Sequence, residues 1–308
     1  MGAATGVVLA RSGGTYRVHT AAAEVSAVLR GKLKHRDEDR VVAGDVVDLE
    51  VQGDGGVTIA GVHPRRSVLA RRAPGKRRPQ PIAANVDQVV VVASTRDPEP
   101  NPRLFDRFLV VAEANSLPVV LVVNKVELDR AAAERLARRY APAGYQVLAT
   151  SVKAPEGLPA LRDLLRGRAS VLTGPSGVGK SSLVNALQPG LNLRIGEISE
   201  KWRTGRHTTT AAQLIPLAIG GYVVDTPGMR EVGTWGIDAE LLGPCFPEFR
   251  RYLDRCRFDN CRHLAEPGCA VRRAAAEGGI DPDRLVSYER IHEEVSVPSW
   301  STGRRRAP

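Results

Sequence analysis

Short runs of alternating apolar and polar residues fill the first part of the chain, up to about residue 70. The runs are TYRVHT, EVSAVLRGKL, GDVVDLEV and GVTIAGV, and Gly and Asp separate them. Alternation with a period of two is typical of strands that bury one face. Four or five short strands in so small a segment predict a closed antiparallel barrel, because closure removes exposed strand edges. We expect an OB-fold over residues 1–72.

From about residue 82 the strands become apolar at every position and alternate with helical stretches. The strands are DQVVVVAS, PVVLVVN, YQVLATS and ASVLTG, and the helical stretches between them are RLFDRFLVVAEANS, AAAERLARRYAPAG and GLPALRDLLRG. Strands buried on both faces that alternate with helices form parallel sheets with right-handed crossovers. The pattern predicts a doubly wound α/β domain over residues 73–235, which continues with a helix at SSLVNALQ and strands at AAQLIPLAI and YVVDT.

Beyond about residue 232 the pattern is helical and rich in Arg, and this part holds Cys256, Cys261 and Cys269. We expect a C-terminal α-helical domain over residues 236–308, with a basic tail at GRRR. The chain is therefore predicted to be multidomain, as its 308 residues with 21 Pro and 30 Gly also favour.

The charge balance is basic, with 44 Lys and Arg against 34 Asp and Glu, a net charge of +10. A positive field favours polyanionic partners such as RNA. The run RRSVLARRAPGKRR at 65–78 contains no acid and is either part of such a surface or a solvated linker at a domain junction. In the predicted barrel, Tyr16 is the only aromatic residue beside the cations Arg30, Lys32, Lys34 and Arg36. Binding by shape and backbone charge is thus favoured over stacking on bases.

No stretch approaches the roughly 20 uninterrupted apolar residues that a bilayer span requires. The N-terminal MGAATGVVLARSGG has an apolar patch but neither a preceding basic segment nor a clear cleavage site, so it does not match a signal peptide. We expect a cytoplasmic monomer with no membrane partner.

GPSGVGKS at 174–181 matches the phosphate-loop pattern, follows the strand SVL and begins a helix. The glycines let backbone amides point at the phosphates, and the start of the helix adds partial positive charge. Lys180 is expected to reach the outer phosphates, and the Ser181 hydroxyl to bind magnesium. The predicted GTP-binding residues here are Gly174, Pro175, Ser176, Gly177, Val178, Gly179, Lys180, Ser181 and Ser182.

NKVE at 124–127 follows the buried strand PVVLVV, at the strand end where ligands of such sheets bind. The Asn124 amide can bond to the acceptors of guanine, the Lys125 stem can lie across the ring, and Glu127 can accept from N1–H and the 2-amino group. Adenine lacks this pair of donors, and an unpaired buried carboxylate is unfavourable, so the motif predicts GTP rather than ATP. Most guanine-binding proteins carry Asp in place of Glu127, and the extra methylene must shift the base or the strand end.

SVK at 151–153 follows the next strand, and its backbone amides can close over the base. Alone this motif is weak. It adds Ser151, Val152 and Lys153 to the predicted GTP-binding residues.

DTPG at 225–228 ends another strand. Asp225 is expected to hold magnesium through water, and the Gly228 amide to meet the terminal phosphate. Upstream, GRHTTT at 205–210 supplies hydroxyls for magnesium from Thr208 or Thr209, between which the sequence does not choose. The alternatives are a plain turn for DTPG and a polar loop for GRHTTT.

The order of these motifs is unusual, because base and closing motifs precede the phosphate loop, whereas in common small GTPases they follow DxxG. This order indicates a circular permutation, which is permissible because the ends of a doubly wound domain lie at its surface and are often close together. GLPALRDLLRG would be the join, and the new end falls after DTPGMRE. We hypothesise that the nucleotide state sets the pose of the C-terminal domain, because DTPG leads straight into that domain.

Cys256, Cys261, His263 and Cys269 form a Cys₃His set within CRFDNCRHLAEPGC. Four soft ligands at short spacing suit tetrahedral zinc, and a closed four-ligand site has a structural role. The alternative is a reduced cysteine cluster or a disulfide. Cys245 lies outside the set, as a buried thiol. A plausible RNA face surrounds the ligands, made of Arg250, Arg251, Arg255, Arg257, Arg262, Arg272 and Arg273.

The permuted motif order, the preceding barrel and Cys-x₄-Cys-x-His-x₅-Cys after DTPG together resemble the RsgA family, also called YjeQ or EngC. These are bacterial GTPases of small ribosomal subunit maturation. The resemblance covers nearly the whole chain and includes GPSGVGKSSL, GRHTTT and PGC. It implies an OB-fold, a permuted GTPase domain and a zinc domain, with rRNA and the small (30S) subunit as partners. It also implies GTP hydrolysis stimulated by that subunit in late assembly.

The resemblance to this family also implies a catalytic residue. In Ras-like enzymes a Gln after DxxG orients the attacking water, but Met229 follows Gly228 here. Intrinsic turnover should therefore be slow. His207, beside the threonines, is the candidate that the resemblance implies for positioning water, and the alternative is a solvent-exposed loop histidine.

Three other functions compete with this one. A nucleoside monophosphate kinase has a loop similar to GPSGVGK but no use for NKVE or DTPG. A nucleotide-gated RNA-binding placeholder would use hydrolysis only as a release clock. A structural zinc module with an inactive nucleotide fold is disfavoured by intact Lys180, Ser181 and Asp225.

Overall fold

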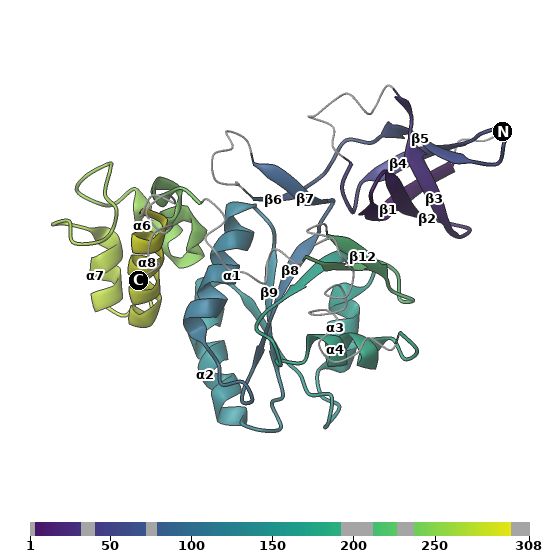
Figure 1. The fold of residues 1–308 in the computed structure, drawn as a ribbon. Helices are drawn as coiled ribbons and strands as arrows, with labels where there is room; N and C mark the ends of the chain where they lie inside the picture. Colours follow the sequence, from purple (N-terminus) through teal and green to yellow (C-terminus); the bar gives the residue numbers. More distant parts are fainter. Residues whose placement is uncertain (1–3, 32–40, 72–78, 192–211, 227–236, 297–308) are drawn as a thin grey trace, which may run out of the picture.

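The computed structural model describes residues 4–31, 41–71, 79–191, 212–226 and 237–296. It contains an N-terminal barrel, a central α/β domain and a C-terminal group of helices, which follow one another along the chain (Figure 1). This architecture confirms the predicted multidomain fold. None of the helices in the described ranges combines the length and the apolar character that a bilayer crossing requires.

Five strands close the barrel in the order β1-β2-β3-β5-β4. Strands β3 and β5 are parallel, the other pairs are antiparallel, and β1 closes the ring by pairing with β4. The alternating pattern places Tyr16, Val18 and Ile59 inside, where they are buried. The predicted OB-type barrel is confirmed. Its strands are β1 (Ala4–Ser12), β2 (Thr15–Thr20), β3 (Glu24–Leu29), β4 (Val46–Val51) and β5 (Val57–Val62).

A two-stranded ribbon, β6 (Val68–Arg71) with β7 (Gln80–Ala84), follows the barrel. The sequence pattern does not predict this ribbon, because part of it lies in the basic run at the expected domain junction. Leu69 and Ala83 of the ribbon are fully buried in the same core as the central sheet. The predicted boundary after residue 72 lies outside the described residues, and the domain limits remain predictions.

The central sheet has six strands in the order β10-β9-β8-β11-β13-β12. All neighbours are parallel except β12 and β13, which are antiparallel because residues 217–221 join them by a turn too short for a crossover. The turn contains two glycines with positive φ, Gly220 and Gly221. The strands are β8 (Gln88–Ser94), β9 (Val119–Asn124), β10 (Gln146–Ala149), β11 (Ala169–Thr173), β12 (Gln213–Pro216) and β13 (Tyr222–Asp225).

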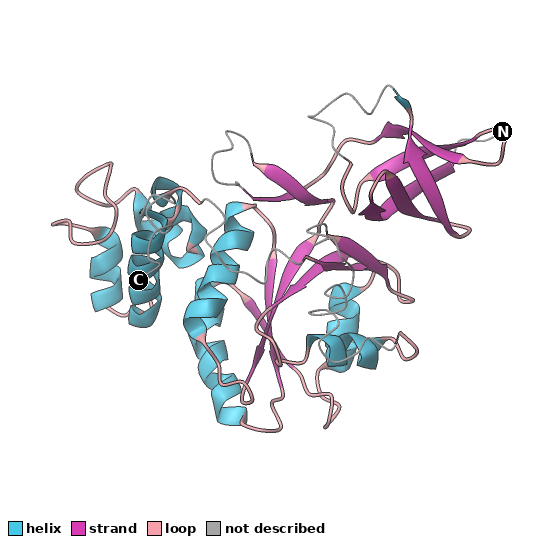
Figure 2. Cartoon of the chain, viewed as in Figure 1, coloured by secondary structure: helices cyan, strands magenta, loops and turns pink. Residues whose placement is uncertain are grey.

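Helices cover both faces of this sheet (Figure 2). Side chains of α1 and α2 share one core with the sheet, while those of α3 and α4 form the other core. Asn101 and Asp129 cap α1 and α2 by accepting hydrogen bonds from backbone amides of the first turn. The helices are α1 (Pro102–Ala114), α2 (Arg130–Tyr140), α3 (Leu158–Leu165) and α4 (Lys180–Leu187), with a short η3 (Ala141–Ala143) after α2. Helix α3 is the connection predicted as the join of the permuted domain.

The C-terminal domain packs three aromatic residues, Phe246, Phe249 and Tyr288, at its centre. Its elements are η5 (Ala239–Leu241), η6 (Gly243–Cys245), η7 (Pro247–Phe249), α6 (Arg250–Leu253), α7 (Ala270–Ala276) and α8 (Pro282–Ser296). The predicted helical character is confirmed, and η6 and α8 pack against α1 of the central domain (Figure 1).

A buried charge cluster joins the C-terminal domain to the central domain. Arg284 of α8 is 1% exposed and bonds to Asp106 of α1 at 2.5 Å and to Glu248 of η7 at 2.6 Å. Burial lowers the pKa of the guanidinium, but attraction to the Asp106 and Glu248 carboxylates outweighs it, so the pKa is raised above its ordinary value. Arg284 also stacks against Phe246 at 4.6 Å. These contacts fix the orientation of α8 on α1.

The barrel contacts the central domain at β12 and β13. His19 of β2 forms a 3.0 Å hydrogen bond between its Nδ1 and the hydroxyl of Tyr222, the first residue of β13. Strand β1 packs against β12. The central sheet therefore lies between the two flanking domains.

Candidate nucleotide site and metal cluster

The predicted nucleotide motifs converge at one edge of the sheet. β8, β9, β10, β11 and β13 are parallel, so their carboxyl ends lie at the same edge. Asn124 ends β9, Ser151 follows β10, Gly174 follows β11 and Asp225 ends β13. Segments that are far apart in the sequence thus meet at the position where such sheets bind ligands.

The loop between β11 and α4 has the tight backbone that a phosphate loop requires. Gly174 has φ +138°, and a Cβ there would lie 2.1 Å from the Val92 carbonyl oxygen. Gly177 and Gly179 also have positive φ, and α4 begins directly after Gly179. Only glycine fits these positions without strain. The loop is followed by a helix N-terminus, so its amides and the helix dipole can act on the same anion.

Lys180 lies across this loop. Its Nζ donates to the carbonyl oxygens of Gly174 at 2.8 Å and Pro175 at 2.7 Å. Lys180 and Ser181 are both buried, whereas Ser182, on the next position of α4, is partly exposed. An ammonium group held here is at the mouth of the loop, where it can exchange carbonyl partners for phosphate oxygens.

Asn124 links the base motif to the phosphate loop. The residue is 2% exposed, and its Nδ2 donates to the Val178 carbonyl oxygen at 2.9 Å. Its Oδ1 accepts from the Thr150 hydroxyl at 3.2 Å. Gly179 leaves room for this contact, because a Cβ there would lie 2.3 Å from Nδ2. Asn124 therefore fixes the two loops relative to each other, a role that sequence reasoning did not assign.

The rest of the base motif is more open. Lys125 has φ +60°, its Nζ donates to the carbonyl oxygen of Asp97, and its own carbonyl accepts from the Thr95 hydroxyl at 2.5 Å. Glu127 is exposed, and its side chain bonds to no described residue. Sequence reasoning missed Thr95 and Asp97, for which the only signal is their position after β8.

The closing motif begins with a buried residue and ends with an exposed one. The Ser151 hydroxyl accepts from the Ala154 amide at 2.9 Å, and Ser151 also pairs with Glu156 through the backbone. Val152 is partly buried and Lys153 is exposed. Hydrogen bonds among its own residues thus stabilise the turn at 151–156. The predicted residues Ser151, Val152 and Lys153 lie beside the base motif because β10 and β9 are adjacent.

The predicted magnesium ligands are described in part. Asp225 and Ser181 are both buried; Asp225 ends β13, and Ser181 lies in the first turn of α4, which follows the adjacent strand β11. Thr226, next to Asp225, is buried, and its hydroxyl has no hydrogen-bond partner among the described residues. The Asp225 carboxylate and the Ser181 hydroxyl are hard oxygen ligands suited to Mg²⁺. The predicted His207, Thr208, Thr209 and Gly228 lie outside the described residues.

The predicted metal ligands do come together. The donor atoms of Cys256, Cys261, His263 and Cys269 all lie within 4.8 Å of one another. His263 Nδ1 lies 3.5 Å from the sulfurs of Cys256 and Cys269. Tetrahedral zinc with Zn–S bonds of about 2.3 Å needs sulfur atoms about 3.8 Å apart. Three thiols and one imidazole at these distances fit a metal ion after small shifts of the donors.

The surroundings of the cluster favour metal binding. Burial lowers the pKa of His263, which keeps the imidazole neutral and able to act as a ligand, although it also raises the pKa of the Cys261 thiol to about 12, which opposes formation of the thiolate. Backbone amides of Ala270 and Arg272 point at the sulfurs of Cys256 and Cys269, at 3.4 and 3.5 Å. These donors would stabilise thiolates once a cation compensates their charge.

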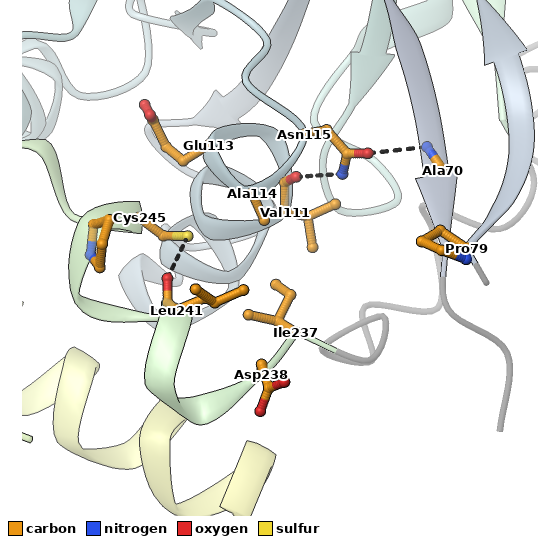
Figure 3. A pocket seen from close by; sticks show the side chains of 11 residues that line it. Ala70, Pro79, Val111, Glu113, Ala114, Asn115, Ile237, Asp238, Leu241 and Cys245 are labelled. Carbon is orange, nitrogen blue, oxygen red and sulfur yellow. Dashed lines mark hydrogen bonds between the residues drawn. The ribbon is translucent and has the colours of Figure 1, made fainter. Parts of the chain in front are cut away.

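The thiol of Cys245 is separate from the cluster. It is buried and donates to the Leu241 carbonyl oxygen at 3.3 Å, beside a cavity between α1, the ribbon and the C-terminal domain (Figure 3). Burial raises the pKa of this thiol to about 11. Asn115, at the same cavity, bonds to the amide of Ala70 and the carbonyl of Val111. The polar groups of Asn115 and Cys245, joined by dashed lines in Figure 3, thus already have hydrogen-bond partners within the protein.

The fold and this site define a P-loop GTPase whose base motif precedes its phosphate loop, which is a circularly permuted arrangement. The model of the RsgA GTPase family matches residues 62–235, more than half of the chain. The chain belongs to the RsgA GTPase family, as the sequence resemblance predicted.

Relatives and solved structures agree with this assignment. The chain is 48% identical over 299 residues to the small ribosomal subunit biogenesis GTPase RsgA of Gemmatimonas aurantiaca, covering 94% of this chain and 97% of the relative. It is 40% identical to the protein of the same name from Moorella thermoacetica, with the same coverage of both chains. The crystal structure of YjeQ from Thermotoga maritima matches with a TM-score of 0.80 at 33% identity, covering 98% of this chain and 100% of the other. YloQ, described as a circularly permuted GTPase, matches with a TM-score of 0.75 at 28% identity, covering 99% and 97%.

Proposed function

We propose that this chain hydrolyses GTP during biogenesis of the small ribosomal subunit, to which it binds. The observation that carries the proposal is the contact between Asn124 and Val178, which joins a guanine motif to a phosphate loop at one sheet edge. The names of the relatives indicate the process, biogenesis of the small ribosomal subunit, and these relatives match nearly the whole chain. Nothing in the described residues or in the comparisons supports the kinase alternative.

In this proposal, the loop amides and Lys180 hold the phosphates, while Ser181 and Asp225 hold Mg²⁺ with Thr208 or Thr209. Asn124, Lys125 and Glu127 hold the base, and the turn at 151–153 closes over it. His207 positions the attacking water, and the Gly228 amide meets the terminal phosphate. When bound, Mg²⁺ neutralises charge on the phosphates. The full set of loop residues is Gly174, Pro175, Ser176, Gly177, Val178, Gly179, Lys180, Ser181 and Ser182.

We propose zinc as the metal of the Cys₃His cluster, with a structural role. Three soft thiolates and one imidazole suit zinc better than magnesium or calcium, which prefer oxygen ligands. Four protein ligands leave no open position for catalysis. The ion would fix the segment 256–269 to α7, whose N-terminus Cys269 caps.

RNA contacts are proposed for the arginines around the cluster. Arg250 and Arg272 are paired with Glu113 and Glu289, so they support the fold rather than a partner. Arg255, Arg262 and Arg273 are exposed and form no ion pair with any described residue. These free charges would contact phosphates of rRNA. A cytoplasmic location and a monomeric state fit this role and remain predictions.

One experiment tests the proposal: phosphate release from GTP and from ATP, with and without purified small subunits. We expect slow release from GTP alone, faster release with subunits and almost none from ATP. Equal turnover of GTP and ATP, or no effect of the subunits, would refute the proposal. Comparing subunit release with GTP and with a nonhydrolysable analogue separates catalysis that drives maturation from a simple release clock.

A further inference from the structure

A second cavity lies between α1 and α8, where the central and C-terminal domains pack together. Its volume is about 340 Å³. Unlike the cavity in Figure 3, it combines several charged side chains with a hydroxyl that lacks a partner among the described residues. The charged and polar side chains that line it are Arg103 and Arg107 of α1 and Ser287, Arg290, Glu293 and Glu294 of α8.

Ser287 is the unusual member of this lining. It is 4% exposed, and its Oγ has no hydrogen-bond partner within the described ranges. A buried hydroxyl without a partner destabilises a protein, because it loses its hydrogen bonds to water on folding and gains none in return. A hydroxyl at a cavity wall can recover this free energy by donating to a ligand.

The charges in the cavity leave a small positive excess. Arg107 forms an ion pair with Glu294 across the two helices, so these two charges compensate each other. Arg103 and Arg290 are exposed and form no ion pair with any described residue, and Glu293 is exposed as well. Two free guanidinium groups and one free carboxylate remain. This balance suits an oxyanion with a single negative charge and several acceptor oxygens.

The cavity is also preformed. Arg284, one turn before Ser287 on α8, is bonded to Asp106 of α1 beneath the surface. This contact fixes the two helices before any ligand arrives. Binding to a preformed site loses less conformational entropy, which raises affinity.

We propose that this cleft binds a backbone phosphate of RNA, with Arg103 and Arg290 on its two free oxygens and the Ser287 hydroxyl as a third donor. A phosphodiester carries one negative charge, which equals the excess positive charge of the cleft, and it offers two free oxygens to the two guanidinium groups. Arginine suits such oxygens because its donors are fixed in a planar fork. The inference rests on the proposed function, which brings the protein to the rRNA of the small subunit.

The test measures affinity for purified small subunits at several salt concentrations, with a GTP analogue bound. For Arg103→Gln/Arg290→Gln we expect affinity to fall about tenfold or more. The slope of log affinity against log salt should decrease by about 0.7–0.9 for each RNA phosphate that the variant no longer neutralises. Arg162→Gln is the matched control, because Arg162 is exposed on α3 with no ion pair to any described residue. GTP binding should be unchanged in all three proteins.

Ser287→Ala separates ligand binding from a structural role. We expect weaker subunit binding, by a few-fold, together with an unchanged or higher melting temperature, because the variant removes an unpaired buried hydroxyl. A lower melting temperature with unchanged subunit affinity would assign Ser287 to the fold and contradict the inference.

The outcomes distinguish the two proposals. If the wild type binds subunits and the double variant retains both its affinity and its salt slope, the cleft is not an RNA site, although the proposed function stands. Competition by millimolar inorganic phosphate at constant ionic strength, abolished in the double variant, would identify a free-phosphate site and also overturn the inference. If the wild type does not bind subunits at all, both proposals fail.

Discussion

The side-chain amide of Asn124 donates a hydrogen bond to the Val178 carbonyl oxygen, 2.9 Å away, and so connects the end of β9 to the loop before α4. The contact is possible because the neighbouring residue, Gly179, has no side chain. Base and phosphate motifs are thus held in one arrangement by a single buried amide. We therefore expect the proposed nucleotide site to be sensitive to changes at Gly179.

Gly179→Ala should weaken binding of GTP and GDP by about 10- to 100-fold, because its Cβ would displace Asn124 Nδ2. The matched control is Gly190→Ala. Gly190 also has positive φ, at +98°, but a Cβ there meets nothing within 4 Å. It should destabilise the protein by about 1 kcal/mol and leave nucleotide affinity unchanged. Titration with a fluorescent GDP analogue measures the nucleotide affinity of both variants, and equal losses of affinity would assign the effect to backbone strain alone.

Glu127→Gln should abolish the preference for GTP over ATP. The amide replaces one of two acceptor oxygens by a donor, which faces donors of the guanine, so GTP affinity should fall by about 100-fold while the weak affinity for ATP stays the same. Glu134→Gln is the control, since Glu134 is an exposed acid on α2 paired with Arg138. Isothermal titration with both nucleotides tests this, and retained selectivity would remove Glu127 from base recognition.

Arg284→Met should lower the free energy of unfolding by about 3–5 kcal/mol, because it leaves Asp106 and Glu248 buried without a counter-charge. Arg138→Gln, which removes an exposed ion pair on α2, should change it by less than about 0.5 kcal/mol. Denaturant unfolding measures both variants. A similar small effect for each would mean that the charge cluster does not hold the domains together.

Cys261→Ser should lower zinc content well below one ion per chain, whereas Cys245→Ala should retain one ion, because Cys245 lies outside the cluster. Zinc affinity should also rise as the pH increases from about 6 to 8. Burial raises the pKa of Cys261, so the metal must displace protons from thiols, and fewer protons compete at higher pH. Elemental analysis and chelator competition check these results. Full zinc content in the Cys261 variant would exclude it as a ligand.

His207→Ala should abolish the stimulation of GTP hydrolysis by small subunits while GTP affinity stays within about twofold of the wild type. The reason is that a residue that positions water contributes to the transition state and little to nucleotide binding. Single-turnover phosphate release with saturating subunits is the measurement, and His292→Ala, which removes a buried histidine of α8, controls for loss of a His elsewhere. Unchanged stimulated turnover would exclude His207 from the mechanism.

Local pattern was sufficient to predict most elements of the fold. The apolar residues of β9 and the alternating residues of the barrel strands show directly in the sequence which positions are buried. Once the strands are located, the motifs at their ends can be located as well. The ribbon β6–β7 escaped prediction because basic residues surround its few apolar positions. The contacts Asn124–Val178 and Arg284–Asp106 also escaped, because they depend on which elements are neighbours in space and carry no spacing signal.

The pairing of Asp106 with Arg284 has a consequence for how the protein is made. The two residues are 178 positions apart, and Arg284 lies in the last helix of the described ranges. While the chain is being synthesised, the Asp106 carboxylate has no partner from α8 and remains open to water. The face of α1 that carries it can be covered only after α8 has left the ribosomal tunnel, so docking of the C-terminal domain must follow the synthesis of the whole central domain.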